Sequence, residues 1–227
     1  MAAIVNISPV KVLVMTRVPS GPITGWVWEL LTGTPLFQLE GHRGAITVLS
    51  FSPDQRTILS SSLDQTARIW DAETGELRHT LSGHQSLITN ARFSPDGALV
   101  ATGSGDRTVK LWDAASGALL STLEGFPSTV NQLGFNPQDT RLLAWPIESL
   151  SLWDVEGRKM LDLPVQGNDT GDFLTFATWS PDGTQILACY RSGAVRLWDA
   201  LSWAELLEQG DPDTPIEDMI AAWKTAR

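Results

Sequence analysis

The chain is poor in the residues that reactive sites and cross-links require. It contains one cysteine, Cys189, and three histidines among 227 residues. A single cysteine cannot form an intrachain disulfide or a cysteine-rich zinc site. Two of the histidines, His42 and His84, are assigned below to a repeated network, so too few remain for a metal cluster. We therefore expect no metal site and no cofactor.

Basic charge is also scarce. The chain has 16 Lys and Arg against 26 Asp and Glu, and its net charge is −10. An acidic surface repels phosphate backbones, so we expect neither nucleic acid nor an anionic membrane as a partner. The sequence contains no run of about 18 apolar residues, so no membrane-spanning helix is expected. Residues Met1–Met15 lack the basic start of a secretory signal, which favours a cytoplasmic protein.

Tryptophan, by contrast, is abundant and regularly placed. Five of the ten tryptophans are separated by 42, 42, 41 and 45 residues: Trp28, Trp70, Trp112, Trp153 and Trp198. A period of this length is typical of repeat architectures. Within one copy, short apolar runs alternate with turn residues such as Ser94-Pro95-Asp96-Gly97. The third copy predicts four short strands, at Ile88–Phe93, Leu99–Thr102, Thr108–Trp112 and Ala118–Leu123.

The motifs in this repeat resemble those of the WD-repeat (Trp-Asp repeat) β-propeller family. The third copy carries Gly83-His84, the Ser-Pro-Asp-Gly turn, Asp106 and Trp112-Asp113 at family spacing, and the second copy matches it closely. The resemblance implies an all-β WD-repeat propeller. We count about five four-stranded blades, whereas family members commonly have about seven. The five blades either close into a ring by packing alone or form an open, incomplete arc.

The predicted propeller occupies residues 1–209, with copies at about 1–38, 39–80, 81–122, 123–163 and 164–209. Residues 210–227 form a C-terminal tail in which a short helix is expected. Pro215 suits a first helical turn, and Ile216, Ile220 and Trp223 fall on one helical face. A frayed tail is the alternative.

The resemblance also implies two structural tetrads of hydrogen-bonded side chains. They are His42, Ser60, Asp64 and Trp70 in the second copy, and His84, Thr102, Asp106 and Trp112 in the third. The combination of Ser, His and Asp also occurs in hydrolases. Because it appears twice at a 42-residue spacing, we interpret it as scaffold and expect no catalytic residue.

The fourth and fifth copies depart from this pattern. The fourth has Phe126 at the His position and Ala144 at the hydroxyl position, and the fifth has Ala188 and Ser192 at the hydroxyl and Asp positions. The fourth copy is therefore predicted to be the weakest blade.

Family members use propeller loops to grip peptides or domains, so the resemblance implies a non-catalytic scaffold for protein or peptide partners. Mapped onto this chain, the candidate contacts are Leu63, Leu87, Phe173 and Arg191, with Trp145 as a possible hot spot. The alternatives are that Leu87 and Phe173 plug the central channel and that Trp145 is part of irregular packing. Two other functions remain open for the chain. It could be a regulatory or sensor fragment related to bacterial signalling proteins with WD repeats, or an enzyme on a propeller scaffold. The sequence leaves the oligomeric state undetermined.

Overall fold

The computed structural model describes residues 3–7, 11–17, 23–146, 149–157, 159–163 and 173–199. Strands and turns make up this part of the chain, and no helix that could span a membrane occurs in it. The strands form five separate antiparallel sheets, arranged one after another along the chain. Each sheet corresponds to one copy of the sequence repeat and is called a blade below.

Each blade is a meander in which consecutive strands pair. Blade 1 consists of β1 (Ala3–Ile7), β2 (Lys11–Arg17), β3 (Ile23–Glu29) and β4 (Pro35–Leu39). Blade 2 consists of β5 (Ile46–Phe51), β6 (Thr57–Ser62), β7 (Thr66–Asp71) and β8 (Leu77–Ser82). Blade 3 consists of β9 (Ile88–Phe93), β10 (Leu99–Ser104), β11 (Val109–Asp113) and β12 (Leu119–Leu123). Blade 4 consists of β13 (Gln132–Phe135), β14 (Arg141–Trp145), β15 (Leu150–Asp154) and β16 (Lys159–Leu163).

Blade 5 has three described strands, β17 (Leu174–Trp179), β18 (Gln185–Tyr190) and β19 (Val195–Asp199). The all-β fold and the five repeated sheets are thus confirmed. The fourth strand expected for this blade and the expected C-terminal helix fall within residues 200–227, outside the described part of the chain.

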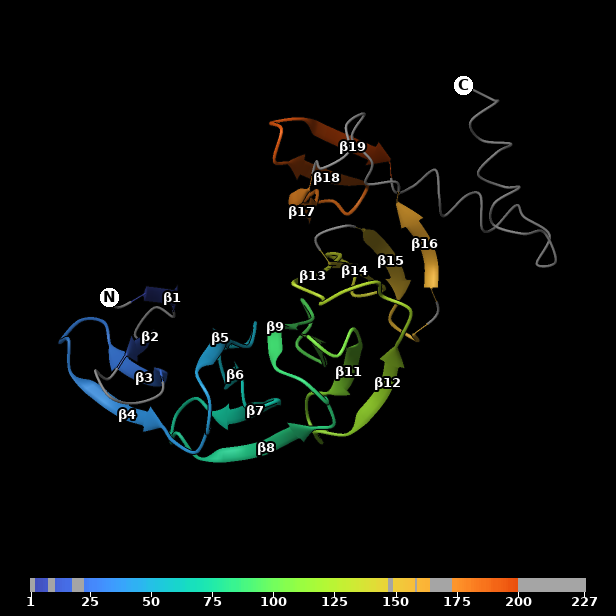
Figure 1. Ribbon diagram of the computed structural model, residues 1–227. Helices are drawn as coiled ribbons and strands as arrows, with labels where there is room; N and C mark the ends of the chain where they lie inside the picture. The colour runs from blue at the N-terminus through green and yellow to red at the C-terminus, as the bar shows by residue number, and fades with distance from the viewer. Residues whose placement is uncertain are drawn as a thin grey trace, which may run out of the picture.

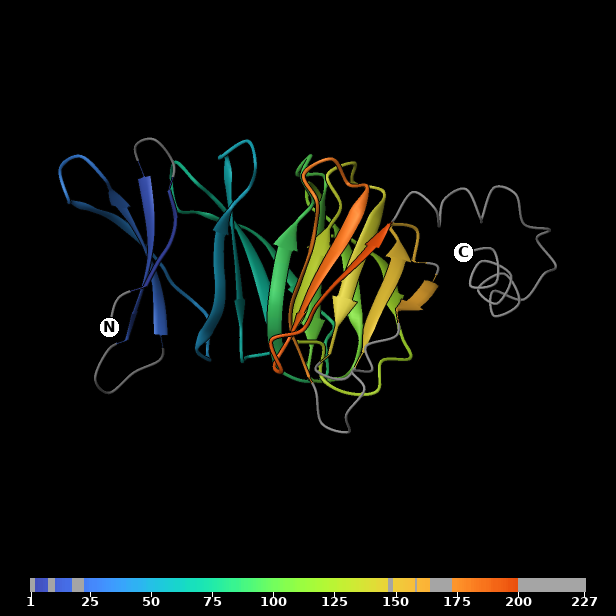
Figure 2. The ribbon, with the colours of Figure 1, turned by 90° about the horizontal axis from the view of Figure 1, so that it is seen from above.

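The blades lie side by side in an open arc, with β5, β9, β13 and β17 on its concave side and β8, β12 and β16 on its convex side (Figure 1). Blade 1 and blade 5 stand at the two ends of the arc, separated by a gap in Figure 1, and from above blade 2 is seen between them (Figure 2). Of the two possibilities that the sequence left open, the described residues therefore adopt the open arc.

The hydrophobic core lies between the blades. Blades 2, 3 and 4 each turn one face to the preceding blade and the other to the following one. Between blades 3 and 4, for example, Ala101, Leu111, Leu142 and Trp153 belong to one buried cluster. The alternation of side chains along each strand supplies both faces, because successive residues point to opposite sides of the sheet.

The tight turns between the second and third strands of blades 2 and 3 share an unusual backbone. Gln65 has φ 73° and Arg107 has φ 65°, at equivalent positions. The left-handed region is uncommon for residues other than glycine, so these turns need support from outside the backbone. The preceding aspartates provide it: Asp64 Oδ1 accepts from the amide of Thr66 and Asp106 Oδ1 from that of Thr108, each at 3.0 Å.

Candidate functional site

A chain of four hydrogen-bonded side chains crosses blade 2. The indole Nε1–H of Trp70 donates to Ser60 Oγ at 2.8 Å, and the same hydroxyl lies 2.8 Å from His42 Nε2. On the other side of the ring, His42 Nδ1 lies 2.9 Å from Asp64 Oδ2. The backbone amide of Arg43 donates to the same oxygen. The network therefore ties the loop before β5 to the β6–β7 turn.

Blade 3 repeats this arrangement almost atom for atom. Trp112 Nε1 donates to Thr102 Oγ1 at 2.9 Å, and that hydroxyl lies 2.8 Å from His84 Nε2. His84 Nδ1 lies 2.8 Å from Asp106 Oδ2. The eight residues that the sequence assigned to two tetrads are thus brought together in two sets of four, one in each blade.

A neutral histidine ring gives each polar atom of the network a hydrogen-bond partner. With its proton on Nδ1, His84 donates to Asp106 and accepts at Nε2 from the hydroxyl of Thr102, which in turn accepts from Trp112. Burial lowers the pKa of His42 and His84 below the usual 6.5, and outweighs the opposing effect of Asp64 and Asp106. A second proton on Nε2 would also require the hydroxyl to turn its own proton away from the ring. The folded chain therefore favours the uncharged ring.

The two aspartates are held in their charged form. Burial on its own would raise the pKa of Asp106, but hydrogen bonds from the amide of Gln85, from Thr108 and from His84 lower it to about 2. Burial would also raise the pKa of Asp64, but hydrogen bonds from Thr66, from the amide of Arg43 and from the ring of His42 hold it well below its usual range. A carboxylate that accepts several hydrogen bonds is stabilised as the anion.

The hydroxyls of both networks are closed to solvent. Ser60 and Thr102 are fully buried, and each oxygen already contacts an indole N–H and an imidazole nitrogen. A nucleophile must reach a reacting atom of a substrate, and neither hydroxyl has a free side that a substrate could approach. The geometry is that of a structural network that connects a loop to a turn.

Blade 4 places apolar groups at the His and hydroxyl positions. Phe126 and Ala144 are buried with Trp153, and the ring centroids of Phe126 and Trp153 lie 5.4 Å apart. The Asp position falls on Glu148, outside the described residues. In blade 5, Ala188 takes the hydroxyl position and is fully buried in the cluster that blades 4 and 5 share. At these positions blades 4 and 5 have apolar packing, where blades 2 and 3 each contain a polar network.

Four of the five expected partner contacts lie at one rim of the arc, where the inner strands begin; it is called the front rim below. Backbone hydrogen bonds join Leu63 to Ala45 in blade 2 and Phe173 to Arg191 in blade 5, and Leu87 has the corresponding place in blade 3. Leu63 is 46 % exposed, Leu87 38 % and Phe173 37 %, and Arg191 is exposed as well.

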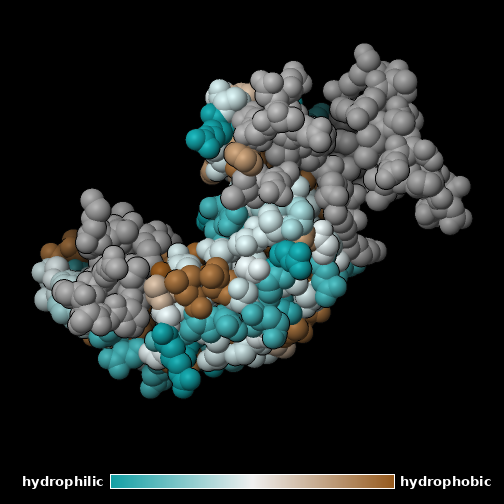
Figure 3. Space-filling model, viewed as in Figure 1, coloured by the Kyte–Doolittle hydropathy of each residue, from teal (hydrophilic) through white to brown (hydrophobic). Residues whose placement is uncertain are grey.

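Leu63 and Leu87 lie in adjacent blades, whereas Phe173 and Arg191 lie two blades further on. A view onto the front rim shows apolar surface over blades 2 and 3, beside the hollow of the arc (Figure 3). The expected patch therefore divides into an apolar pair on blades 2 and 3 and a mixed pair on blade 5.

The fifth candidate, Trp145, is not a surface residue, and its expected role as a hot spot is wrong. It is 4 % exposed and belongs to the buried cluster between blades 4 and 5, with Leu143, Leu174 and Tyr190. Trp145 ends β14 on the face that blade 5 covers, so its ring fills the contact between the two sheets. The alternative interpretation, packing, describes its place.

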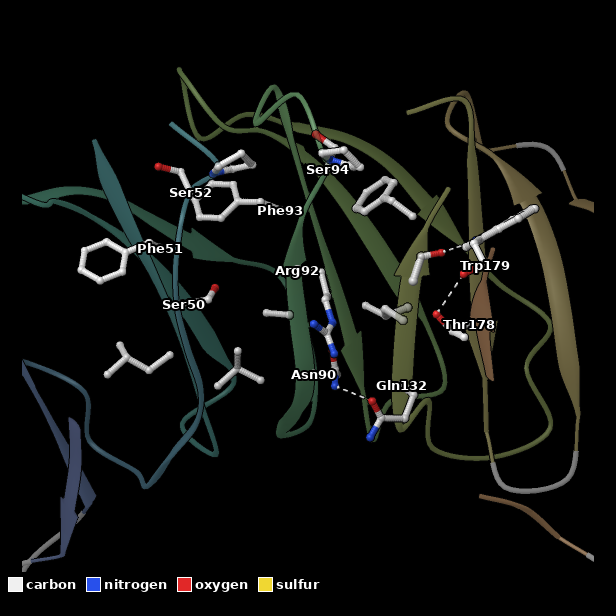
Figure 4. Close-up of a pocket in the computed structure, with 18 of the residues that line it drawn as sticks. Ser50, Phe51, Ser52, Asn90, Arg92, Phe93, Ser94, Gln132, Thr178 and Trp179 are labelled. Atoms are coloured by element: carbon white, nitrogen blue, oxygen red, sulfur yellow. Dashed lines mark hydrogen bonds between the residues drawn. The ribbon is translucent and has the colours of Figure 1, made fainter. Parts of the chain in front are cut away.

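The arc encloses a hollow of about 980 Å³ that the sequence did not reveal. It is lined by the inner strands of blades 2 to 5 (Figure 4). Polar and apolar groups alternate on its wall. Asn90 Nδ2 donates to Gln132 Oε1 across neighbouring blades at 3.1 Å, and Trp179 Nε1 donates to the carbonyl of Gly134 at 3.1 Å. These bonds link successive inner strands.

Potential metal ligands do not gather in the part of the chain that the structure describes. No group of three or more His, Cys, Asp or Glu side chains there could hold an ion. His79, the histidine outside the two networks, lies with Nε2 2.8 Å from the carbonyl of Ala115.

Comparison with known proteins agrees with this architecture. The family model described as "WD domain, G-beta repeat" matches residues 33–71, 75–113 and 164–199, which together make up half of the chain. These ranges cover blade 2, most of blade 3 and the described part of blade 5. No curated protein matches the chain.

Proposed function

Because the chain belongs to the WD-repeat family, whose members generally act as protein-protein interaction scaffolds, we propose that its front rim binds a protein or peptide partner. WD-repeat proteins are typically non-catalytic, and we propose the same for this chain. The observation that carries the proposal is the pair of exposed leucines, Leu63 and Leu87, on adjacent blades of one rigid rim.

The rigidity of the rim supports binding. Leu63 is followed directly by Asp64, which the network of blade 2 holds in place, and Leu87 lies three residues after His84 of the blade 3 network. Apolar side chains that are fixed before binding lose little conformational freedom when a partner covers them. Both blades thus present an apolar side chain from a supported loop.

The character of the rim indicates the kind of partner. The exposed leucines favour an apolar side chain of the partner at the centre of the contact. We propose a peptide or loop with an apolar anchor.

The experiment uses a displayed library of peptides selected on the full chain, with the tightest peptide resynthesised for titration. Leu63→Asp and Leu87→Asp are expected to weaken its binding by roughly tenfold or more each, about 1.4 kcal/mol or more. Leu31→Asp is the matched control, because Leu31 is 81 % exposed in the β3–β4 turn at the opposite rim. Selected peptides that bind both rim variants as tightly as the original chain would refute the proposal.

A further inference from the structure

The last described blade has one face that no described residue covers. Along β18, Ile186, Ala188 and Tyr190 are buried in the cluster shared with blade 4, so the alternate residues Leu187 and Cys189 point to the other side. The same side carries Phe176, Val195 and Leu197 on the neighbouring strands. These five residues, Phe176, Leu187, Cys189, Val195 and Leu197, are called the end face below.

The end face is continuous across the sheet. Phe176, Cys189 and Val195 pair with one another in one row, and Leu187 and Leu197 pair in the next. Phe176 is 53 % exposed, Val195 61 % and Leu197 57 %. Contiguous apolar surface of this kind marks a place where something binds or packs.

The preceding blades show what this surface does when it is covered. Val195 and Leu197 correspond to Val109 and Leu111 of blade 3, and both of those are fully buried against blade 4. The corresponding residues of blade 4, Leu150 and Leu152, are buried against blade 5 in the same way. The end face is therefore an inter-blade surface that lacks a described neighbour.

The C-terminal segment supplies suitable chemistry for a cover. Ile216, Ile220 and Trp223 recur at the spacing of one helical face, and Pro215 suits the first turn. A helix of this length is marginal alone in water, because most helical stability comes from packing of the apolar face. The segment needs an apolar surface, and the end face needs an apolar cover.

The chain can bring the two together. The last described strand, β19, ends at Asp199 in the sheet that carries the end face. Pro215 lies 16 residues further along the chain, a distance that can span up to about 53 Å. The three described strands side by side are only about 10 Å across. A helix over residues 216–226 would be about 16 Å long, sufficient to cross the strands of the end face.

We propose that residues 215–227 pack as an amphipathic helix on the end face of blade 5, with Ile216, Ile220 and Trp223 against Phe176, Val195 and Leu197. The helix takes the place that a following blade has elsewhere in the arc. It thereby closes the apolar end of the arc without a further sheet.

Cys189 provides the measurement, because the single cysteine of the chain lies within the end face. The rate of its alkylation by N-ethylmaleimide is followed by mass spectrometry in the full chain. Ile220→Glu places a charge in the proposed contact and is expected to increase the rate about tenfold, as displacement of a local cover does. Ala221→Glu makes the same change on the opposite side of the helix and is expected to leave the rate unchanged.

Removal of residues 210–227 is expected to increase the rate to the same extent as Ile220→Glu. Two results would overturn the proposal. One is a rate of Cys189 alkylation that is the same in the full chain, in the Ile220→Glu variant and in the truncated chain. The other is protection of Cys189 that grows with protein concentration, since a second copy would then be the cover. Because Ile220→Glu retains the full chain, the test does not depend on the truncated form folding.

Discussion

The rings of Phe126 and Trp153 lie 5.4 Å apart in blade 4, where blades 2 and 3 place a histidine near the equivalent tryptophan. In blade 2 the corresponding distance, from His42 to Trp70, is 6.3 Å. The position therefore keeps an aromatic contact, and the histidine and the hydroxyl that bind each other in blades 2 and 3 are both replaced by apolar side chains. Loss of one polar group is less harmful when its hydrogen-bond partner is lost with it, because that partner is then not left buried and unpaired.

This relationship predicts that restoring the histidine alone is harmful. Phe126→His would bury an imidazole beside Ala144, which offers no hydroxyl, and should lower the free energy of unfolding by about 1–3 kcal/mol. Adding Ala144→Thr should recover part of that loss. Urea unfolding of the single and double variants measures both effects, and a Phe126→His chain as stable as the original would contradict the interpretation.

Asp106→Ala should destabilise the fold by about 1–3 kcal/mol, because it leaves His84 buried without its acceptor. Glu124→Ala removes the same charge from an exposed position near the end of β12 and should stay within about 0.5 kcal/mol of the original chain. Thermal and urea unfolding compare the two. Equal stability of both variants would show that the tetrad contributes nothing to the fold.

The lowered pKa of both network histidines predicts a loss of stability in mild acid. In the unfolded chain each histidine takes up a proton near pH 6.5, whereas in the folded chain it does so only at lower pH. The unfolded state thus binds more protons below about pH 6.5, so the stabilisation is complete above that pH and is lost as the pH falls further.

Urea midpoints measured from pH 8 to pH 5 test this dependence. His84→Asn removes one of the two responsible rings and should reduce the slope between pH 6.5 and pH 5, even though the variant is less stable at pH 8. A slope unchanged by His84→Asn would mean that other groups cause the acid sensitivity.

Blade 4 should open more readily than blade 3. Without the network that ties a loop to the adjacent turn, amides within residues 126–152 should exchange hydrogen faster than those within residues 83–108. Mass spectrometry of peptides from the two ranges, in the same exchange experiment, makes the comparison internal. Equal or slower exchange in blade 4 would show that the Phe126 packing fully replaces the polar network.

The repeat, the strands and the members of both tetrads could be predicted from the sequence, because they depend on interactions within one period of the chain. Alternating apolar residues, a Pro-Asp-Gly turn and a recurring tryptophan are all local signals. His84 and Asp106 are only 22 residues apart, and the same pair recurs in blade 2. Family spacing was therefore sufficient to group them.

Whether an apolar side chain is exposed or buried depends on which blade lies next to it, and only the tertiary structure decided that. Trp145 interrupts the repeat and resembled a surface hot spot, but blade 5 covers the face on which it lies. Leu197 occupies the same position in its strand as the fully buried Leu111, yet it is 57 % exposed because no described blade follows. Both faces of β18 are apolar between Ile186 and Tyr190, which was the one available signal of an inter-blade surface. Strand patterns indicate which face is apolar, whereas burial also requires a neighbouring surface, and the open arc determines where that neighbour is present.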